Sequence, residues 1–277
     1  MQVFRRSVLT ACVLFPMSWL APPLAAQSPE AANASTSSAS ARTWLENRTE
    51  IEEYLRTAEV VKLADIGTGV TNPKRGDLAP GGPVAAMAWK PIRPGRYNGY
   101  WESYKSEIAA YELDKLLELN MVPPTVERRL KGDLGAAVMW AAPTKSFGEL
   151  GGPPTAPPDH FESWNRQIIR AKMFDNLIHN KDPNLGNWLV DPAWNLILID
   201  HTRAFTTGRT IVHKMTRIDA DLWDRMKALT EESLTAAIGK WLSRGEIRSV
   251  IQRRDRLQEI IDKMVAETSA AAVFVRE

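Results

Sequence analysis

The sequence has almost no cysteine. Cys12 is the only one among 277 residues, and it lies in an apolar stretch near the N-terminus. If that stretch is removed by processing, the remaining chain has no thiol. A protein without thiols cannot form disulfides, thiolate metal sites or a cysteine nucleophile, so these three kinds of chemistry are excluded for the processed chain.

The sequence also lacks a marked excess of either charge. It has 35 Lys and Arg side chains and 33 Asp and Glu side chains. Arg5 and Arg6 lie in the N-terminal stretch, so the rest of the chain has 33 basic and 33 acidic side chains. Proteins that bind nucleic acid normally carry a basic excess. Composition therefore gives no support for a nucleic-acid partner.

Long hydrophobic runs are missing except at the N-terminus. There, Arg5 and Arg6 precede an almost wholly apolar stretch over residues 7–20, and small residues follow at 24–26. This pattern predicts a signal peptide over residues 1–26 that is cleaved on export. The Ala- and Ser-rich residues 27–42 predict a disordered tether. We therefore expect a periplasmic or secreted protein with no membrane contact after cleavage.

Three alternatives for this N-terminal segment remain open. The apolar run could be kept as a membrane anchor, although prolines interrupt it and it is short for a span. Residues 9–12 resemble a lipoprotein cleavage box, although almost no apolar stretch precedes them. Finally, the segment could stay uncleaved, which would leave the domain in the cytoplasm.

The pattern over residues 43–142 predicts a small lobe of helix and sheet. Apolar spacing indicates helices over 44–55 and 101–119, the second with a stripe that includes Trp101 and Tyr104. Short apolar runs predict strands at 60–66 and 84–89, joined by a loop rich in Gly, Pro and basic residues. A hairpin is expected from strands at 125–130 and 134–140.

Residues 143–277 read as a mostly helical lobe, which begins with a Pro- and Gly-rich connection over 143–158. A helix capped by Ser163 is expected to end near residue 179. Two short strands follow, at 187–190 and 196–199. Three amphipathic helices are expected after residue 220, with their charged side chains facing solvent.

The chemically distinctive part of the sequence is a set of oxygen-bearing side chains in the second lobe. Asp182 follows a helix, Asn187 comes five residues later, and Asp200 ends the next strand pair. Phosphoryl transfer needs a carboxylate near the attacking hydroxyl and metal ligands across the nucleotide phosphates. Oxygen ligands of this kind suit Mg²⁺. The spacing therefore predicts Asp182 as the catalytic residue and Asn187 and Asp200 as metal ligands.

The first lobe supplies residues for the nucleotide half of such a site. Lys90 ends a predicted strand, where its ammonium could reach the phosphates, and Glu107 lies on the following helix, where it could pair with Lys90. Gly67 and Gly69 form a candidate phosphate loop. The backbone near residues 139–142 is a candidate hinge for adenine. An exposed salt bridge and an ordinary glycine turn are the alternative interpretations.

These segments resemble the catalytic region of atypical kinases. The resemblance lies in Phe174-Asp175-Asn176-Leu177-Ile178-His179-Asn180-Lys181-Asp182, Gly186-Asn187-Trp188 and Leu198-Ile199-Asp200. They are similar to the phosphoinositide 3-/4-kinase-like group, the HipA-type kinases and the secretory-pathway (Golgi) kinases, whose members are also exported. The resemblance covers roughly residues 60–205, and its specific part is 182–200.

The sequence departs from ordinary protein kinases at three points. Asn180-Lys181 stands before the catalytic Asp instead of His-Arg, and His201-Thr202 follows Asp200 instead of Phe-Gly. No G-x-G-x-x-G is present.

The resemblance implies an α+β, two-lobed kinase-like fold, with a small antiparallel sheet plus one helix followed by a mostly helical lobe. It also implies an ATP- and Mg²⁺-dependent phosphotransferase that acts on a hydroxyl acceptor. The alternative is a catalytically silent kinase-like binding module. Two further alternatives have weaker support. A turn built by Asp182 would need no catalysis, and a zinc site from His179, His201 and His213 would lack the usual ligand spacing.

Overall fold

The computed structural model describes residues 40–67, 73–182 and 184–276. The chain divides into two compact units, residues 1–37 and 38–277, and every described residue belongs to the second. The predicted signal peptide, most of the predicted tether and Gly69 lie outside the described residues. Within the described part of the chain, no helix combines the length and the apolar character needed to cross a bilayer.

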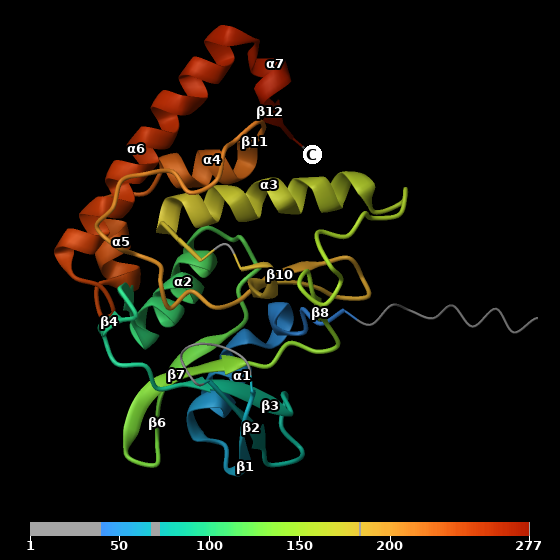
Figure 1. Cartoon of the computed structure of the whole chain (residues 1–277), viewed down its shortest axis with the longest axis vertical. Helices are drawn as coiled ribbons and strands as arrows, with labels where there is room; N and C mark the ends of the chain where they lie inside the picture. The colour runs from blue at the N-terminus through green and yellow to red at the C-terminus, as the bar shows by residue number, and fades with distance from the viewer. Residues whose placement is uncertain (1–39, 68–72, 183, 277) are drawn as a thin grey trace, which may run out of the picture. The chain divides into compact units, whose positions relative to one another are not determined.

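A five-stranded antiparallel sheet forms the first half of the described chain (Figure 1). Its spatial order is β1-β2-β3-β7-β6. The strands are β1 (Val60–Asp65), β2 (Lys74–Leu78), β3 (Ala86–Lys90), β6 (Thr125–Leu130) and β7 (Asp133–Met139). Helices α1 (Trp44–Thr57) and α2 (Tyr104–Leu116) both contact β6 and β7. The predicted strands and hairpin of this region are therefore present.

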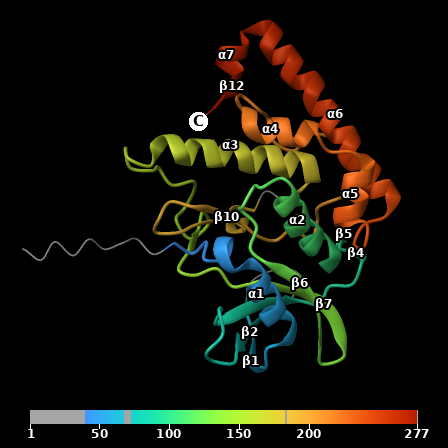
Figure 2. The same ribbon diagram turned by 180° about the vertical axis from the view of Figure 1, so that it is seen from behind.

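The second half of the described chain is mostly helical, as Figure 2 shows from behind. Its helices are α3 (Phe161–Ile178), α4 (Ala220–Lys227), α5 (Glu231–Ile238), α6 (Arg244–Glu267), α7 (Ala270–Val273) and the 3₁₀ turn Leu185–Asn187. Short strands accompany them: β8 (Lys145–Ser146), β9 (Trp188–Val190), β10 (Leu196–Leu198), β11 (Ile218–Asp219) and β12 (Phe274–Val275). The predicted α+β class, a small antiparallel sheet followed by a helical region, is confirmed.

Three local predictions were wrong. Strand β2 occupies the stretch that was expected to be a loop, because Gly76 and its neighbours pair with β1 and β3 without an apolar pattern of their own. Trp101 is not helical but lies in β5 (Tyr100–Glu102), which pairs with β4 (Gly95–Tyr97). Helix α3 begins after His160, and Ser163 lies inside it, donating from Oγ to the His160 carbonyl at 3.0 Å.

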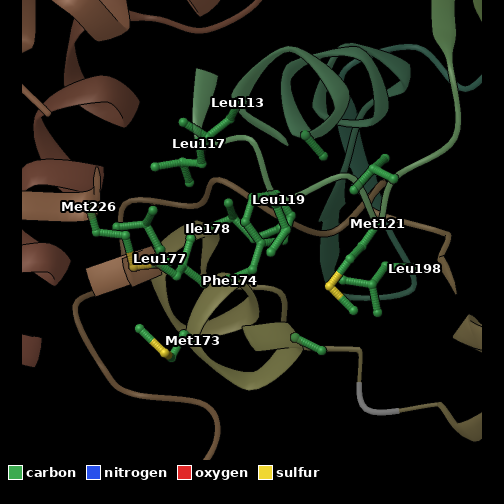
Figure 3. Close-up of a cluster of buried hydrophobic side chains, with 14 of the residues drawn as sticks. Leu113, Leu117, Leu119, Met121, Met173, Phe174, Leu177, Ile178, Leu198 and Met226 are labelled. Atoms are coloured by element: carbon green, nitrogen blue, oxygen red, sulfur yellow. The ribbon is translucent and has the colours of Figure 1, made fainter. Parts of the chain in front are cut away.

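The largest hydrophobic core lies between α2 and the helices of the second half. Figure 3 shows its centre, where α3 contributes Met173, Phe174, Leu177 and Ile178. Strand β10 separates this core from a smaller one under the sheet. Its alternating side chains place Leu196 and Leu198 in the large core and Ile197 in the smaller one. The segment that follows β10 therefore starts at the boundary between the two halves.

Candidate active site

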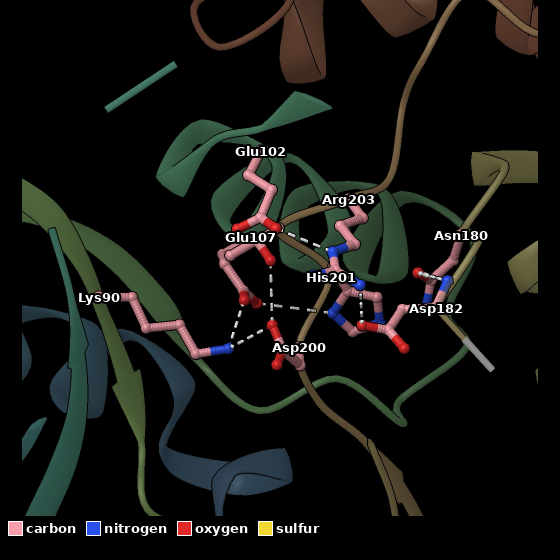
Figure 4. A network of polar contacts seen from close by, with 9 residues as sticks. Lys90, Glu102, Glu107, Asn180, Asp182, Asp200, His201 and Arg203 are labelled. Atoms are coloured by element: carbon pink, nitrogen blue, oxygen red, sulfur yellow. Dashed lines mark hydrogen bonds and ion pairs between the residues drawn. The ribbon is translucent and has the colours of Figure 1, made fainter. Parts of the chain in front are cut away.

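A buried ion-pair cluster connects the sheet to the helical half. Nζ of Lys90, the last residue of β3, lies 2.5 Å from Oε1 of Glu107 on α2 and 2.9 Å from Oδ1 of Asp200. The Lys90 and Glu107 side chains are only 8% and 2% exposed, and that of Asp200 is 30% exposed. Figure 4 shows these three side chains converging. We call them the lysine cluster.

Burial and pairing shift the protonation of this cluster. Burial acts to lower the pKa of Lys90, but the negative charges of Asp200 and Glu107 outweigh it and raise that pKa. Burial acts to raise the pKa of Glu107, but Lys90 and then His201 outweigh it and lower that pKa. Both side chains are therefore ionised at neutral pH. Buried charges are costly even when paired, so such a cluster in a cleft is characteristic of a functional site.

The segment after Asp200 is fastened to the start of α2. Ser103 donates its backbone N–H to the Thr202 carbonyl at 2.9 Å, and Oγ of Ser106 donates to the Ala204 carbonyl at 3.3 Å. Nδ1 of His201, a fully buried residue, lies 3.7 Å from Oε2 of Glu107. The position of Asp200 is therefore coupled to the helix that carries Glu107.

The β9–β10 hairpin brings Asn187 close to Asp200 in the fold. Trp188 pairs with Leu198, and the backbone N–H of Ile199 donates to the Asn187 carbonyl at 3.0 Å. Asn187 is buried, and its Nδ2 has no hydrogen-bond partner among the described residues. Asp200 has a left-handed backbone, with φ of 62°. Side chains other than Gly adopt this conformation at a cost, and Asp is among those that tolerate it best.

Asp182 lies in a loop that begins where α3 ends. His179, the residue after α3, has φ of 55° and terminates the helix. Asn180 is buried, and its Nδ2 donates to Oδ1 of Asp175 at 3.2 Å. Its Oδ1 accepts from the backbone N–H of Asp182 at 3.4 Å, a long hydrogen bond. Asp182 in turn accepts from the backbone N–H of Asn184 at 3.3 Å. The loop that carries Asp182 is therefore anchored to α3 through Asn180.

A second set of charges links Asp182 to the β4–β5 hairpin. Arg203 donates from Nε to Oε1 of Glu102 at 2.9 Å and from Nη1 to Oδ2 of Asp182 at 3.1 Å (Figure 4). Glu102 is fully buried, and the Arg203 guanidinium lies 4.3 Å from the Tyr100 ring centroid. Burial acts to lower the pKa of Arg203, but Glu102 and Asp182 outweigh it and raise that pKa. We call Glu102, Arg203 and Asp182 the arginine bridge.

The predicted phosphate loop and the predicted adenine hinge are not part of the lysine cluster or the arginine bridge. Gly67 has φ of 73° and follows β1, while Gly69 lies outside the described residues. In the candidate hinge, the N–H of Met139 donates to the Pro124 carbonyl at 2.8 Å and that of Trp140 to the Ala86 carbonyl at 3.0 Å. Two of the backbone donors expected for adenine are therefore used within the protein.

The three histidines considered for zinc have separate partners. The His179 ring contacts the hydroxyls of Thr206 and Thr210 at 2.5 and 3.0 Å. Nε2 of His213 lies 3.2 Å from Oδ2 of Asp175, and His201 lies beside Glu107. Over the described ranges, no group of three or more His, Cys, Asp and Glu side chains is arranged to hold a metal.

Sequence reasoning missed three residues of this region. Arg203 and Glu102 form the arginine bridge, and Asn98-Gly99 between β4 and β5 is a turn signal that could have revealed the hairpin. Arg253 on α6 was expected to face solvent but is fully buried. It donates to the carbonyls of Leu177, Thr206 and Gly208 at 2.7 to 2.9 Å. No sequence pattern distinguishes this arginine from its exposed neighbours.

Comparison with known proteins shows a similar fold at low sequence identity. No protein-family model matches the sequence, and no curated protein sequence does. The hydra Fam20 structure determined with sugar superposes with a TM-score of 0.64 at 15% identity, covering 83% of this chain and 92% of that one. The Golgi casein kinase with Mn and ADP bound gives 0.61 at 14% identity, covering 82% and 78%.

A bacterial kinase has the same fold. CtkA, a proinflammatory kinase of Helicobacter pylori, gives a TM-score of 0.50 at 13% identity, covering 78% of this chain and 98% of that one. The predicted resemblance to atypical kinases of the secretory pathway is thus confirmed at the level of fold. The resemblance to the HipA-type and phosphoinositide 3-/4-kinase-like groups stays a prediction.

Proposed function

We propose that this chain is an exported kinase that uses ATP and Mg²⁺ to phosphorylate a hydroxyl group. One observation carries the proposal: the Lys90 ammonium lies between Glu107 and Asp200, at 2.5 and 2.9 Å, inside a kinase-like fold. Kinase-like phosphoryl transfer depends on such a lysine, held by a glutamate of the neighbouring helix and placed next to a metal-binding aspartate.

On the nucleotide side, Lys90 would bind phosphate oxygens of ATP. Glu107 would keep the ammonium in place, since it is buried and ionised next to Lys90. Gly67 and Gly69, in the connection between β1 and β2, would provide backbone N–H groups to the phosphates. Each of these roles asks for positioning and electrostatic stabilisation rather than covalent chemistry.

Asn187 and Asp200 would hold the magnesium ion, and their chemistry fits it. Both offer oxygen ligands, and Mg²⁺ typically takes one or two protein carboxylates while water and nucleotide phosphates complete its octahedron. Among the described residues, both hydrogen bonds that Asp200 accepts are made to Oδ1, from Lys90 and Thr202. The ion would neutralise the phosphate charges.

Asp182 would act on the acceptor. A carboxylate in this loop orients the attacking hydroxyl and accepts its proton as the phosphoryl group transfers. The Asp182 side chain is 21% exposed, so an acceptor can reach it. The proposed acceptor is an alcohol group.

The N-terminal sequence pattern supports export, and one of the structures with this fold is a Golgi kinase. We therefore propose a periplasmic or secreted location. A second function, that of a catalytically silent binding module, is favoured by one observation. Asp200 is engaged by Lys90 and Asp182 by Arg203, so both carboxylates already have cationic partners.

Calorimetry with ADP and Mg²⁺ tests the proposal. The chain should bind ADP only with the metal present, and Asp200→Asn should weaken this binding on the order of 100-fold, since a direct ligand should matter at least as much as the outer-shell groups that orient one. Asp133→Asn is the matched control, because Asp133 is 55% exposed and pairs with exposed Arg93 rather than with Lys90. Binding that is absent, or equal in the two variants, removes the enzyme proposal.

A further inference from the structure

A hollow of about 480 Å³ is lined by Lys181, the residue before Asp182, and by Arg203, the ion-pair partner of Asp182. The β4–β5 hairpin contributes Arg96, Tyr100 and Trp101 to its lining. The loop before Asp182 contributes Lys181, and the segment after Asp200 contributes Arg203. Its volume is within the range of small-molecule sites. We call it the basic hollow.

The lining of the basic hollow includes two cations without anionic partners in the described chain. Arg96 and Lys181 are exposed, and neither forms an ion pair with any described residue. Glu246 is the one acidic side chain in the lining, and its Oε2 accepts from both the backbone N–H and Oγ of Ser243 at 2.7 Å. Arg96 and Lys181, unpaired among the described residues, therefore accompany Arg203, whose own charge is already paired with Glu102 and Asp182. The one carboxylate of the lining is engaged by Ser243. This arrangement attracts negative charge.

Arg203 belongs to both the basic hollow and the arginine bridge. Its contacts to Glu102 and Asp182 use Nε and Nη1, and within the described residues no hydrogen bond is made by Nη2. A guanidinium has five N–H donors in a fixed plane and binds oxyanions through two of them at once. The Tyr100 ring lies against one face of the guanidinium, with its centroid 4.3 Å from the guanidinium carbon.

We propose that the basic hollow is an oxyanion subsite, which binds a phosphate or carboxylate group through Arg96, Lys181 and Arg203. We further infer that Arg203 couples this subsite to Asp182. An oxyanion held by Arg203 draws the guanidinium away from the Asp182 carboxylate, which frees that carboxylate for a hydroxyl group. The group belongs to the acceptor, and this assignment rests on the proposed kinase function. The binding of an oxyanion in the basic hollow does not depend on that function.

Titration of the full chain with inorganic phosphate, at constant ionic strength, tests the subsite. We expect saturable binding in calorimetry that weakens at least tenfold in Arg96→Gln and in Lys181→Gln. Arg93→Gln is the matched control, since Arg93 is 79% exposed, lies near Arg96 in the sequence and pairs with Asp133 outside the hollow. Phosphate binding that does not saturate, or that weakens equally in all three variants, overturns the subsite and leaves ordinary solvated cations.

The coupling has its own measurement. Because Asp182 and the oxyanion share Arg203, Asp182→Asn should strengthen phosphate binding about three- to tenfold, whereas a merely structural Arg203 predicts no change. Arg203→Lys should weaken phosphate binding, and because it keeps a cation next to buried Glu102 it preserves the fold. Unchanged affinity in Asp182→Asn refutes the coupling.

A third measurement identifies which molecule supplies the oxyanion. Phosphate is titrated in the presence of Mg²⁺ and a non-hydrolysable ATP analogue. Retained phosphate affinity supports the acceptor-side assignment, and competition shows instead that the hollow binds the terminal phosphate of the nucleotide. If the analogue does not bind at all, the proposed kinase function fails. The subsite still stands in that case, provided the Arg96 and Lys181 variants weaken phosphate binding.

Discussion

The lysine cluster and the arginine bridge hold the two aspartates of the candidate site in different ways. In the lysine cluster the Lys90 and Glu107 side chains are only 8% and 2% exposed, and Asp200, at 30%, is the member that reaches solvent. The arginine bridge combines a fully buried Glu102 with an Asp182 that reaches solvent and a hollow lined by exposed cations. The cation of the nucleotide side is thus buried between two carboxylates, whereas the cation of the acceptor side also lines an open hollow.

The largest expected effect is on the stability that the lysine cluster provides. Lys90→Met leaves the Glu107 carboxylate buried without its cation, so the free energy of unfolding should fall by about 3–5 kcal/mol. Urea denaturation measures this loss. Lys240→Met, at a side chain that is 70% exposed, is the control and should change little. The double variant Lys90→Met/Glu107→Gln should recover much of the stability, and a Lys90→Met loss below about 1 kcal/mol contradicts the contrast between the two halves.

A pH effect is expected at His179, the residue that ends α3. Burial first, and then the charges of Arg253 and Lys181, lower the pKa of His179 to about 4. The folded pKa lies below the unfolded value of about 6.5, so the unfolded chain binds the proton more readily. The contribution of neutral His179 to stability is complete above pH 6.5. It is lost as the pH falls toward 4, by about 1–3 kcal/mol.

Denaturation of the wild type and of His179→Asn at several pH values measures this effect. Asparagine tolerates the left-handed backbone at this position, where φ is 55°. The difference in unfolding free energy between the two proteins should shrink between pH 7 and pH 4.5. A difference that stays constant over this range shows that His179 does not titrate as described.

The smallest expected effect is at the rim of the basic hollow. Arg96→Gln should change the unfolding free energy by less than about 0.5 kcal/mol, because Arg96 is exposed and has no ion-pair partner among the described residues. Thermal unfolding provides the measurement. A clearly destabilised variant would mean that Arg96 supports the fold. The contrast between the buried lysine cluster and the open basic hollow would then be weaker.

The sequence predicted the parts of the fold that local patterns encode. Short apolar runs marked β1, β3, β6 and β7, and Lys90 could be placed at a strand end facing a helix. Strand β2 was missed because Gly76 and its neighbours are held by backbone pairing on both sides rather than by an apolar pattern. Local periodicity contains no information of that kind.

The residues of the candidate site also differ in how well local sequence patterns could predict them. The proposed pair of Lys90 and Glu107 followed from a strand end and a helix only 17 residues apart. Arg203 could not be predicted because its partners lie 101 and 21 residues away and belong to different elements. A charged side chain in a loop looks the same in a sequence whether it is solvated or bridges two carboxylates.

The buried Arg253 has a consequence for how the molecule is made. Its guanidinium joins the carbonyls of Leu177, Thr206 and Gly208, which lie 45 to 76 residues before it. These three carbonyls gain their contact with Arg253 only after the ribosome has synthesised the first ten residues of α6. A nascent or truncated chain that ends before residue 253 therefore contains all the proposed catalytic side chains but lacks the contacts that Arg253 makes.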